Sequence, residues 1–198
     1  MDYIFRKAGP EDIPQIAALM KAVYDAMPDK SLFVCDDEAF VRRVVMEDGF
    51  AVMAVPEDSG ADRIGVEAAG AACPCGEAGS RPAAVLLVFF PGSGKENLGR
   101  DIGLPESELP GVVHMDSAVV LGEHRGHHLE YRMLLEAEHM LDPVRYPYIM
   151  ATVAPENAAS LHSLEKAGLR IAVTKEKYCG VLRHILLKER RNAPDIGF

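Results

Sequence analysis

Apolar and polar positions along the chain predict four helices and seven strands. Four segments place apolar residues at every third or fourth position, the spacing of a helix with one buried side: residues 13–27, 37–47, 126–141 and 155–167. Short alternating or uninterrupted apolar runs predict the strands: residues 2–7, 50–55, 83–90, 112–121, 148–153, 169–175 and 181–188. The resulting order, β-α-α-β-β-β-α-β-α-β-β, is typical of a mixed α/β domain. No repeat or linker divides residues 1–190, so we expect one domain, followed by a frayed tail over residues 191–198.

Two connections in this order are long for a domain of this size. Residues 56–82 are rich in Gly, Ala and acidic residues, and we expect them to form an elongated hairpin connection. Residues 92–110 predict a second long loop, with Pro105 and Pro110 as breakers. Because both connections flank strands that would form a cleft, we expect them to carry specificity for what the cleft binds.

Composition narrows the class of protein. The chain has 198 residues, a net charge of −9 and 48% apolar residues. This apolar content excludes disorder for most of the chain, and the acidic balance argues against nucleic-acid binding. The N-terminus shows no signal-peptide pattern, and the longest apolar runs, about eight residues, are too short to span a bilayer. We therefore expect a cytoplasmic protein that binds neither nucleic acid nor membrane.

Cysteine and histidine usage gives little support for a metal site. Four cysteines are too few for a disulfide framework at this length. Cys73 and Cys75 form a tight pair that lacks a second pair, so we expect ordinary thiols and no bound metal. An alternative zinc site would use three neighbouring histidines, His124, His127 and His128. That site would need a further ligand, which the segment around them does not supply.

The segment from Val119 to Glu130 carries the strongest chemical signal. An apolar strand leads into a short polar turn that contains glycine, and a helix follows. The first N–H groups of a helix have no partner within it and carry the positive end of its dipole, so they bind phosphate well. Gly126 would let the backbone approach an anion closely, and Arg125 adds a fixed positive charge.

The order of elements and two motif regions, residues 120–130 and 154–169, resemble the GNAT superfamily of acetyl-CoA-dependent N-acetyltransferases. The resemblance covers residues 2–188. It implies a mixed, mostly antiparallel sheet with a splayed central parallel strand pair, flanked by helices. The parallel pair would be residues 112–121 and 148–153, and the pantetheine arm of the coenzyme would lie between them.

In that family the turn reads arginine or glutamine, two residues, glycine, one residue, then glycine or alanine, and its amides hold the coenzyme A pyrophosphate. Arg125-Gly126 matches the common core, whereas Glu123 stands at the first position and His128 replaces the second small residue. Asn157 matches a family position and would equally serve as an ordinary helix cap. The resemblance implies an acetyl-CoA site formed by Val119, Val120, Arg125, Gly126, His127, His128, Leu129, Glu130, Asn157, Ser160 and Lys166.

Acetyl transfer to an amine also needs a proton for the leaving thiolate. The family often takes this proton from a tyrosine in the helix after the family asparagine. The matching position here is Leu164, so the usual acid is missing. Tyr178 and Tyr131 are the nearest candidates in the sequence, and we assign the role to Tyr178. The alternative is that water supplies the proton or that the thiolate leaves without one, because a thiol is an acceptable leaving group.

The base that accepts the proton of the amine is expected on the strand before the turn. His114, Asp116, Ala118 and Val120 alternate, which would place them on one face of that strand. Asp116 or His114 is therefore the expected base, acting directly or through water. The alternative is a hydrogen-bonded polar pair that only stabilises the strand.

Together these observations predict an N-acetyltransferase that moves acetyl from acetyl-CoA to a primary amine, on a small molecule or a protein, by direct transfer. We expect a monomer or a homodimer. One alternative is a protein of the same fold that binds coenzyme A and regulates rather than catalyses, as Leu164 and His128 would allow. Another is a metal-dependent interaction module centred on Cys73 and Cys75.

Overall fold

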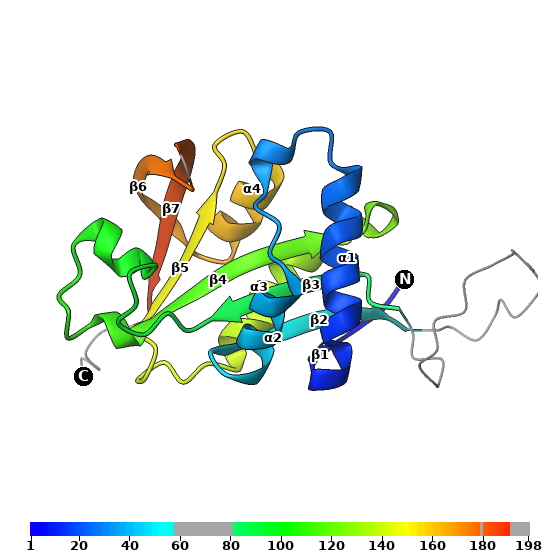
Figure 1. The fold of residues 1–198 in the computed structure, drawn as a ribbon, viewed down its shortest axis with the longest axis horizontal. Helices are drawn as coiled ribbons and strands as arrows, with labels where there is room; N and C mark the ends of the chain where they lie inside the picture. The colour runs from blue at the N-terminus through cyan, green and yellow to red at the C-terminus, as the bar shows by residue number, and fades with distance from the viewer. Residues whose placement is uncertain (58–80, 179, 191–198) are drawn as a thin grey trace, which may run out of the picture.

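Seven strands of the described residues form one sheet in the order β1-β2-β3-β4-β5-β7-β6 (Figure 1). We describe residues 1–57, 81–178 and 180–190 of the computed structural model. The strands are β1 (Tyr3–Lys7), β2 (Gly49–Pro56), β3 (Ala84–Phe89), β4 (Val112–Val120), β5 (Tyr148–Val153), β6 (Arg170–Lys177) and β7 (Val181–Glu189). The helices are α1 (Ile13–Ala26), α2 (Glu38–Met46), α3 (Leu129–His139) and α4 (Ala158–Lys166). The predicted order of helices and strands is confirmed.

All neighbouring strands are antiparallel except β4 and β5, which are parallel. Their pairing covers three positions, from Val112 with Tyr148 to His114 with Met150. Beyond these positions, β4 stays paired with β3 as far as Val120, and β5 stays paired with β7. The two strands thus diverge, which confirms the splayed central pair that the resemblance implied.

A β-bulge in β4 lies just beyond the point of divergence. Leu86 pairs with Ala118 and Val88 pairs with Met115, so Leu87 alone faces both Asp116 and Ser117. One extra residue reverses which side chains face which layer. The prediction that His114, Asp116, Ala118 and Val120 share one face is therefore wrong. His114 packs against Phe89 in the layer of α1 and α2, whereas Ala118 and Val120 pack against the core beneath α3 and α4.

Two helices cover each face of the sheet (Figure 1). The apolar side of α1 and α2 packs on β2, β3 and β4, with core residues that include Ile16, Met20, Val44, Met53 and Leu87. The apolar side of α3 and α4 packs on the opposite face, with core residues that include Met133, Leu134, Leu164, Leu86 and Ile149. These are the apolar positions whose three-to-four spacing predicted the helices. Within the described residues, no helix is both long and apolar enough to cross a bilayer.

Two predicted helices begin later than the apolar spacing indicated. Helix α3 begins at Leu129 because Gly126 and His128 have φ angles of 83° and 56°, outside the helical region. Helix α4 begins at Ala158 because Asn157 caps it, its side-chain oxygen accepting a hydrogen bond from the Ser160 N–H at 3.3 Å. Both starts lie beside the divergence of β4 and β5, so their free N–H groups are available there.

The described residues include all of the predicted loop over residues 92–110 but only the ends of the connection over residues 56–82. Strands β2 and β3 pair directly, as a hairpin requires, but residues 58–80 of their connection, with Cys73 and Cys75, lie outside the described residues, as do residues 191–198. The predicted loop over residues 92–110 contains two short 3-10 helices, Leu98–Ile102 and Leu109–Gly111. Leu98 packs with Val112, Tyr148, Met150 and Ile185 in a third core. This connection is therefore a structural cover over the sheet.

Asn97 holds this cover in place through buried hydrogen bonds. Its Nδ2 donates to the carbonyls of Gly92 at 2.6 Å and Leu109 at 2.9 Å, and its Oδ1 accepts from the Gly99 N–H at 2.8 Å. The residue is 1% exposed. Since the three backbone groups would lose their partner in a truncated variant, they would be left buried and unsatisfied.

We predict that Asn97→Ala lowers the free energy of unfolding by about 3 kcal/mol, the cost of leaving buried polar groups unpaired. Urea denaturation of the variant and the wild type measures the difference. Ser93→Ala, at an exposed position of the same connection, is the control and should change stability by less than about 0.5 kcal/mol. Equal stability of the two variants would contradict the assignment of the connection as a structural cover.

Candidate functional site

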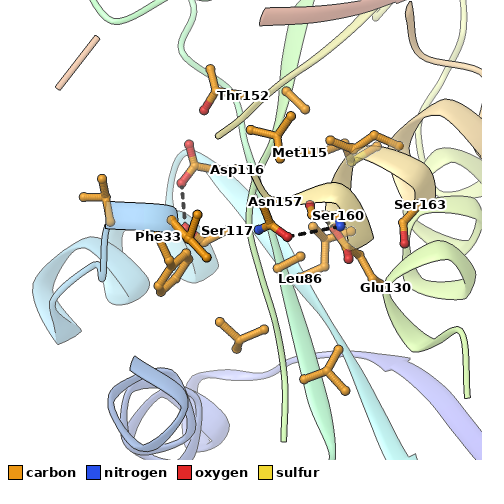
Figure 2. Close-up of a pocket in the computed structure, with 18 of the residues that line it drawn as sticks. Phe33, Leu86, Met115, Asp116, Ser117, Glu130, Thr152, Asn157, Ser160 and Ser163 are labelled. Atoms are coloured by element: carbon orange, nitrogen blue, oxygen red, sulfur yellow. Dashed lines mark hydrogen bonds between the residues drawn. The ribbon is translucent and has the colours of Figure 1, made fainter. Parts of the chain in front are cut away.

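A cavity of about 1040 Å³ opens where β4 and β5 diverge. Its walls include residues 115–120 of β4 and 151–153 of β5, which run along the divergence. One end is lined by the turn before α3 and the start of α4. The other end is lined by the segment between α1 and α2 and by the turn between β6 and β7. Figure 2 shows Glu130, Asn157 and Ser160 toward one side and Phe33, Asp116 and Ser117 toward the other.

The first end is suited to an anion. The N–H groups of the first turn of α3 have no acceptor within the helix and point with its dipole toward the cavity. Arg125, Gly126, His128 and Leu129 all line the cavity at this point. Gly126 has a φ of 83° and His128 a φ of 56°, so both lie in the left-handed region. Glycine adopts that region most easily, which accounts for the glycine that the motif often has at the position of His128.

Glu130 and Ser160 tie the starts of α3 and α4 together. The Ser160 hydroxyl donates to Glu130 Oε1 at 2.6 Å, and Asn157 accepts from the Ser160 N–H. Burial raises the pKa of Glu130, although hydrogen bonds from Ser160 and Ser163 oppose the shift. The carboxyl group is thus held in place by the start of α4 while it lines the cavity.

The second end holds Asp116 and Tyr178. Burial, together with the charge of Asp36, raises the pKa of Asp116 to about 7. Tyr178 lies on the turn between β6 and β7 with a φ of 49°, an unfavourable value for a large side chain. Its hydroxyl is 3.2 Å from Thr152 Oγ1 of β5, and burial raises its pKa, so the hydroxyl stays protonated at neutral pH. The site thus combines a carboxylate that can accept a proton with a phenol that can donate one.

Of three comparisons with known proteins, the one with solved structures places this architecture. No protein-family model and no curated protein matches the sequence. Solved structures do match: Arabidopsis thaliana NAA60 in complex with acetyl-CoA has a TM-score of 0.67 at 13% identity, over 95% of this chain and 98% of that one. An aminoglycoside acetyltransferase in complex with coenzyme A and kanamycin has a TM-score of 0.61 at 12% identity, over 96% of both chains. A GNAT-family acetyltransferase from Streptococcus pneumoniae has a TM-score of 0.59 at 14% identity, over 95% and 99%.

The chain has the GNAT acetyltransferase fold. Nine of the eleven residues that the resemblance implied for the acetyl-CoA site line the cavity of this GNAT fold: Val119, Val120, Arg125, Gly126, His128, Leu129, Glu130, Asn157 and Ser160. The side chain of Val119 is buried in the core beneath α1 and α2.

Two residues of that set are not part of the cavity wall. His127 packs against the ring of Tyr3, with 5.5 Å between ring centroids. Lys166 is exposed, and its Nζ lies 4.4 Å from the centroid of the Tyr131 ring. Both residues make their contacts with aromatic neighbours on the α3 side of the GNAT fold, and neither of them lines the described cavity.

His114 is a poor candidate for the base. Its Nε2 already accepts a hydrogen bond from the Leu98 N–H at 3.1 Å. Burial, with the charge of Lys177, lowers its pKa to about 3, so the ring is neutral and its lone pair is occupied. This geometry is that of a core histidine that anchors the cover over residues 92–110. Asp116 remains as the candidate base on β4.

The position on α4 where the family often has a tyrosine holds no proton donor. Leu164, at the position where the family often has a tyrosine, is 4% exposed and belongs to the core beneath α3 and α4. Tyr178 reaches the same cavity from a different part of the chain. The sequence pointed to Tyr178 only by its position, because nothing in a local pattern shows that the turn between β6 and β7 meets β5.

Asp36 and Ser117 were missed by the sequence analysis. The Ser117 hydroxyl donates to Asp36 Oδ2 at 2.6 Å and lies 3.4 Å from Asp116 Oδ2. Asp36 belongs to the segment between α1 and α2, which has no periodic pattern that predicts its neighbours. Only the acidic run Asp36-Asp37 before a helix was visible, and such a run is ordinary at a helix start.

The histidines of the turn do not gather around a common point. His124 Nδ1 lies 3.0 Å from the Tyr3 hydroxyl, and His127 packs on the same ring. Across the described ranges, no three or more His, Cys, Asp or Glu side chains are grouped as metal ligands. Cys73 and Cys75 lie outside these ranges, so the alternative of a metal-dependent module stays untested.

We predict that Asp116→Asn makes the protein more stable at pH 8. The folded-state pKa of Asp116, about 7, lies above its ordinary value of 3.8, so the folded state binds more protons between these values. The stability contributed by this carboxyl therefore falls as the pH rises from about 4 to about 7 and stays low above that. The variant should have a higher Tm than the wild type at pH 8 and a similar Tm at pH 4.

Thermal unfolding followed by circular dichroism at both pH values provides the measurement. Asp37→Asn, which removes a charge from an exposed aspartate, is the control and should shift Tm equally little at the two pH values. A Tm of Asp116→Asn below that of the wild type at pH 8 would contradict the prediction. It would show instead that the carboxylate belongs to a hydrogen-bonded polar pair that stabilises the strand.

Proposed function

We propose that the protein is an N-acetyltransferase that transfers acetyl from acetyl-CoA to a primary amine, on a small molecule or a protein, by direct transfer. The observation that carries the proposal is the cavity at the divergence of β4 and β5, with an anion-binding helix start at one end and a carboxylate with a raised pKa at the other. The GNAT fold and the cavity together support acetyl transfer as the reaction class.

In this proposal the coenzyme lies along the divergence. Its pyrophosphate binds the free N–H groups at the start of α3 and the charge of Arg125. Its pantetheine arm has amide groups that can pair with the backbone of β4 near Val120, as an added strand would. Asn157 and Ser160, at the start of α4, line the same stretch of the cavity. The thioester is then placed toward Asp116.

In this proposal Asp116 and Tyr178 carry out the proton transfers. Asp116 accepts a proton from the acceptor ammonium, and the resulting neutral amine attacks the carbonyl carbon of the thioester. The C–N bond forms, the C–S bond breaks, and Tyr178 gives its proton to the departing thiolate sulfur. The acylated nitrogen then loses its remaining extra proton to the Tyr178 oxygen, which restores the phenol and leaves a neutral amide. A base with a pKa near 7 is matched to work at neutral pH, because it is partly ionised and still basic enough to accept a proton.

A second candidate function is a regulatory protein that binds coenzyme A without acetyl transfer. The observations that favour it are Leu164 at the usual acid position and His128 in the turn. The position of Tyr178 in the cavity argues for the enzyme, since its hydroxyl can supply the proton that Leu164 cannot. Thiol release from acetyl-CoA, measured with a panel of primary amines, distinguishes the two. The cytoplasmic location and the monomer or homodimer state stay predictions.

We predict that Gly126→Asp weakens acetyl-CoA binding at least tenfold, because it adds a negative charge beside the pyrophosphate. Gly126→Asn is the matched control. Asn and Asp have the same size and tolerate the left-handed backbone similarly, so the two variants share any strain and differ in charge. Isothermal titration calorimetry gives both affinities. Equal affinities of the two variants would remove the pyrophosphate from this turn.

We predict that Asp116→Asn lowers kcat about 10²-fold at neutral pH, the usual effect of losing a positioned base. Acetyl-CoA affinity should change much less, because the residue lies at the other end of the cavity. The loss should shrink as the pH rises, since more of the amine is then already neutral. The assay is thiol release at saturating amine from pH 6 to pH 9.

Tyr178→Phe, measured in the same assay, distinguishes the loss of the proton donor from the loss of the base. It keeps the ring and the φ of the position and removes only the hydroxyl, so its loss of kcat should not shrink as the pH rises. Turnover of Asp116→Asn within twofold of the wild type across the range would exclude Asp116 as the base.

A further inference from the structure

Asp36 and Asp116 come from different parts of the chain and share one hydroxyl group. Asp36 lies just before α2, and Asp116 lies in the bulge of β4. Ser117 Oγ is 2.6 Å from Asp36 Oδ2 and 3.4 Å from Asp116 Oδ2 (Figure 2 shows the contact with Asp116). The single hydroxyl hydrogen can be donated to only one carboxylate at a time. Two carboxyl groups thus face the cavity with one donor between them.

The surrounding charges leave this pair without a protein cation. Burial raises the pKa of Asp36, and the neighbouring charge of Asp37 raises it further. Tyr178, whose pKa is raised by both carboxylates, faces them as a neutral phenol. Two cations of the cavity wall have other partners: Arg183 donates to the carbonyls of Ser31 at 2.6 Å and Leu182 at 3.1 Å, and Lys177 pairs with Asp101 at 2.6 Å. No ion pair to Asp36 or Asp116 is found within the described residues.

The other carboxylates of the cavity wall are already engaged. Glu96 lies 3.7 Å from Arg43, and Glu130 accepts the Ser160 hydrogen bond at the opposite end. The wall beside Asp36 is apolar instead, and its residues are Met27, Leu32, Phe33, Val34 and Phe40. Val34 is 49% exposed and Tyr178 46%, so apolar surface continues to the mouth. This end of the cavity therefore offers room for one cation and for an apolar group beside it.

We propose that Asp36 and Asp116, bridged by Ser117, bind the ammonium group of the acceptor, and that the wall between α1 and α2 selects an acceptor whose single amine is carried on an apolar group. The inference rests on the proposed function, because it names the acceptor class of that same site. The ammonium donates to both carboxylates and replaces their mutual repulsion with attraction. Asp36 then holds the nitrogen while Asp116 accepts its proton.

Binding of 2-phenylethylamine in the presence of coenzyme A tests this directly, because it does not require acetyl transfer. Calorimetry at pH 7.5 should show that 2-phenylethylamine binds at least tenfold more tightly than 1,4-diaminobutane, whose second ammonium meets no free carboxylate. Asp36→Asn should weaken the binding of 2-phenylethylamine at least tenfold. It should leave unchanged the binding of 2-phenylethanol, which has the same apolar group without the charge.

Asp37→Asn is the matched control for the variant. It removes the same charge one residue away, and asparagine still caps α2 in place of the Asp37 oxygen that accepts from the Phe40 N–H. Its affinity for 2-phenylethylamine should stay within threefold of the wild type. Equal affinities of Asp36→Asn and the wild type, tighter binding of the diamine, or no binding of 2-phenylethylamine would each overturn the proposal.

The pH dependence of turnover distinguishes an interacting pair from a purely structural contact. Removing the charge of Asp36 removes a group that raises the pKa of Asp116, so the acidic midpoint of kcat/KM should move to lower pH in Asp36→Asn. An unchanged midpoint would show that the two carboxyls do not act together. Amine binding without thiol release in the wild type would instead contradict the proposed function and leave the ammonium site supported.

Discussion

Incomplete pairing of β4 is the constraint on which the site depends. The strand has two partners up to His114 and only β3 beyond it. The backbone groups on its free edge need a hydrogen-bond partner, because unpaired polar groups are costly when they are covered. A ligand that carries its own amides can supply that partner. The same divergence makes room for the cavity, so the docking edge and the space beside it have one cause.

The bulge adds chemistry to that geometry. It places Asp116 and Ser117 opposite Leu87 alone. Ser117 thereby contacts Asp36, which lies in the segment before α2. A regular strand would have kept His114 and Asp116 on one face with Ala118 and Val120. The extra residue instead places His114 and Ser117 on the side of α1 and α2, and Ala118 and Val120 on the side of α3 and α4. His114 and Asp116 both line the cavity and differ in their partners: His114 Nε2 accepts from the Leu98 N–H, whereas Asp116 lies beside the Ser117 hydroxyl.

Backbone strain is concentrated around the same cavity. Among the described residues, His128 and Tyr178 are the two non-glycine residues with positive φ, and both line it. Such conformations cost free energy and persist where the surrounding structure holds them. His128 lies just before α3, and Tyr178 lines the end of the cavity that holds Asp116. The two ends also differ in their polar groups: helix N–H groups, Arg125 and the Glu130–Ser160 pair line one end, and Asp36, Asp116 and Tyr178 line the other.

The amino-acid sequence by itself determined the elements and their order. Their spacing is local, because a helix or strand repeats its buried side within a few residues. It also located the turn around Gly126, whose role follows from a helix start close by. Only the tertiary structure decided which residues meet at the end of the cavity that holds Asp116. A bulge changes no local pattern, and the approach of Asp36 and Tyr178 to Asp116 depends on how distant segments pack, which single-residue preferences do not encode.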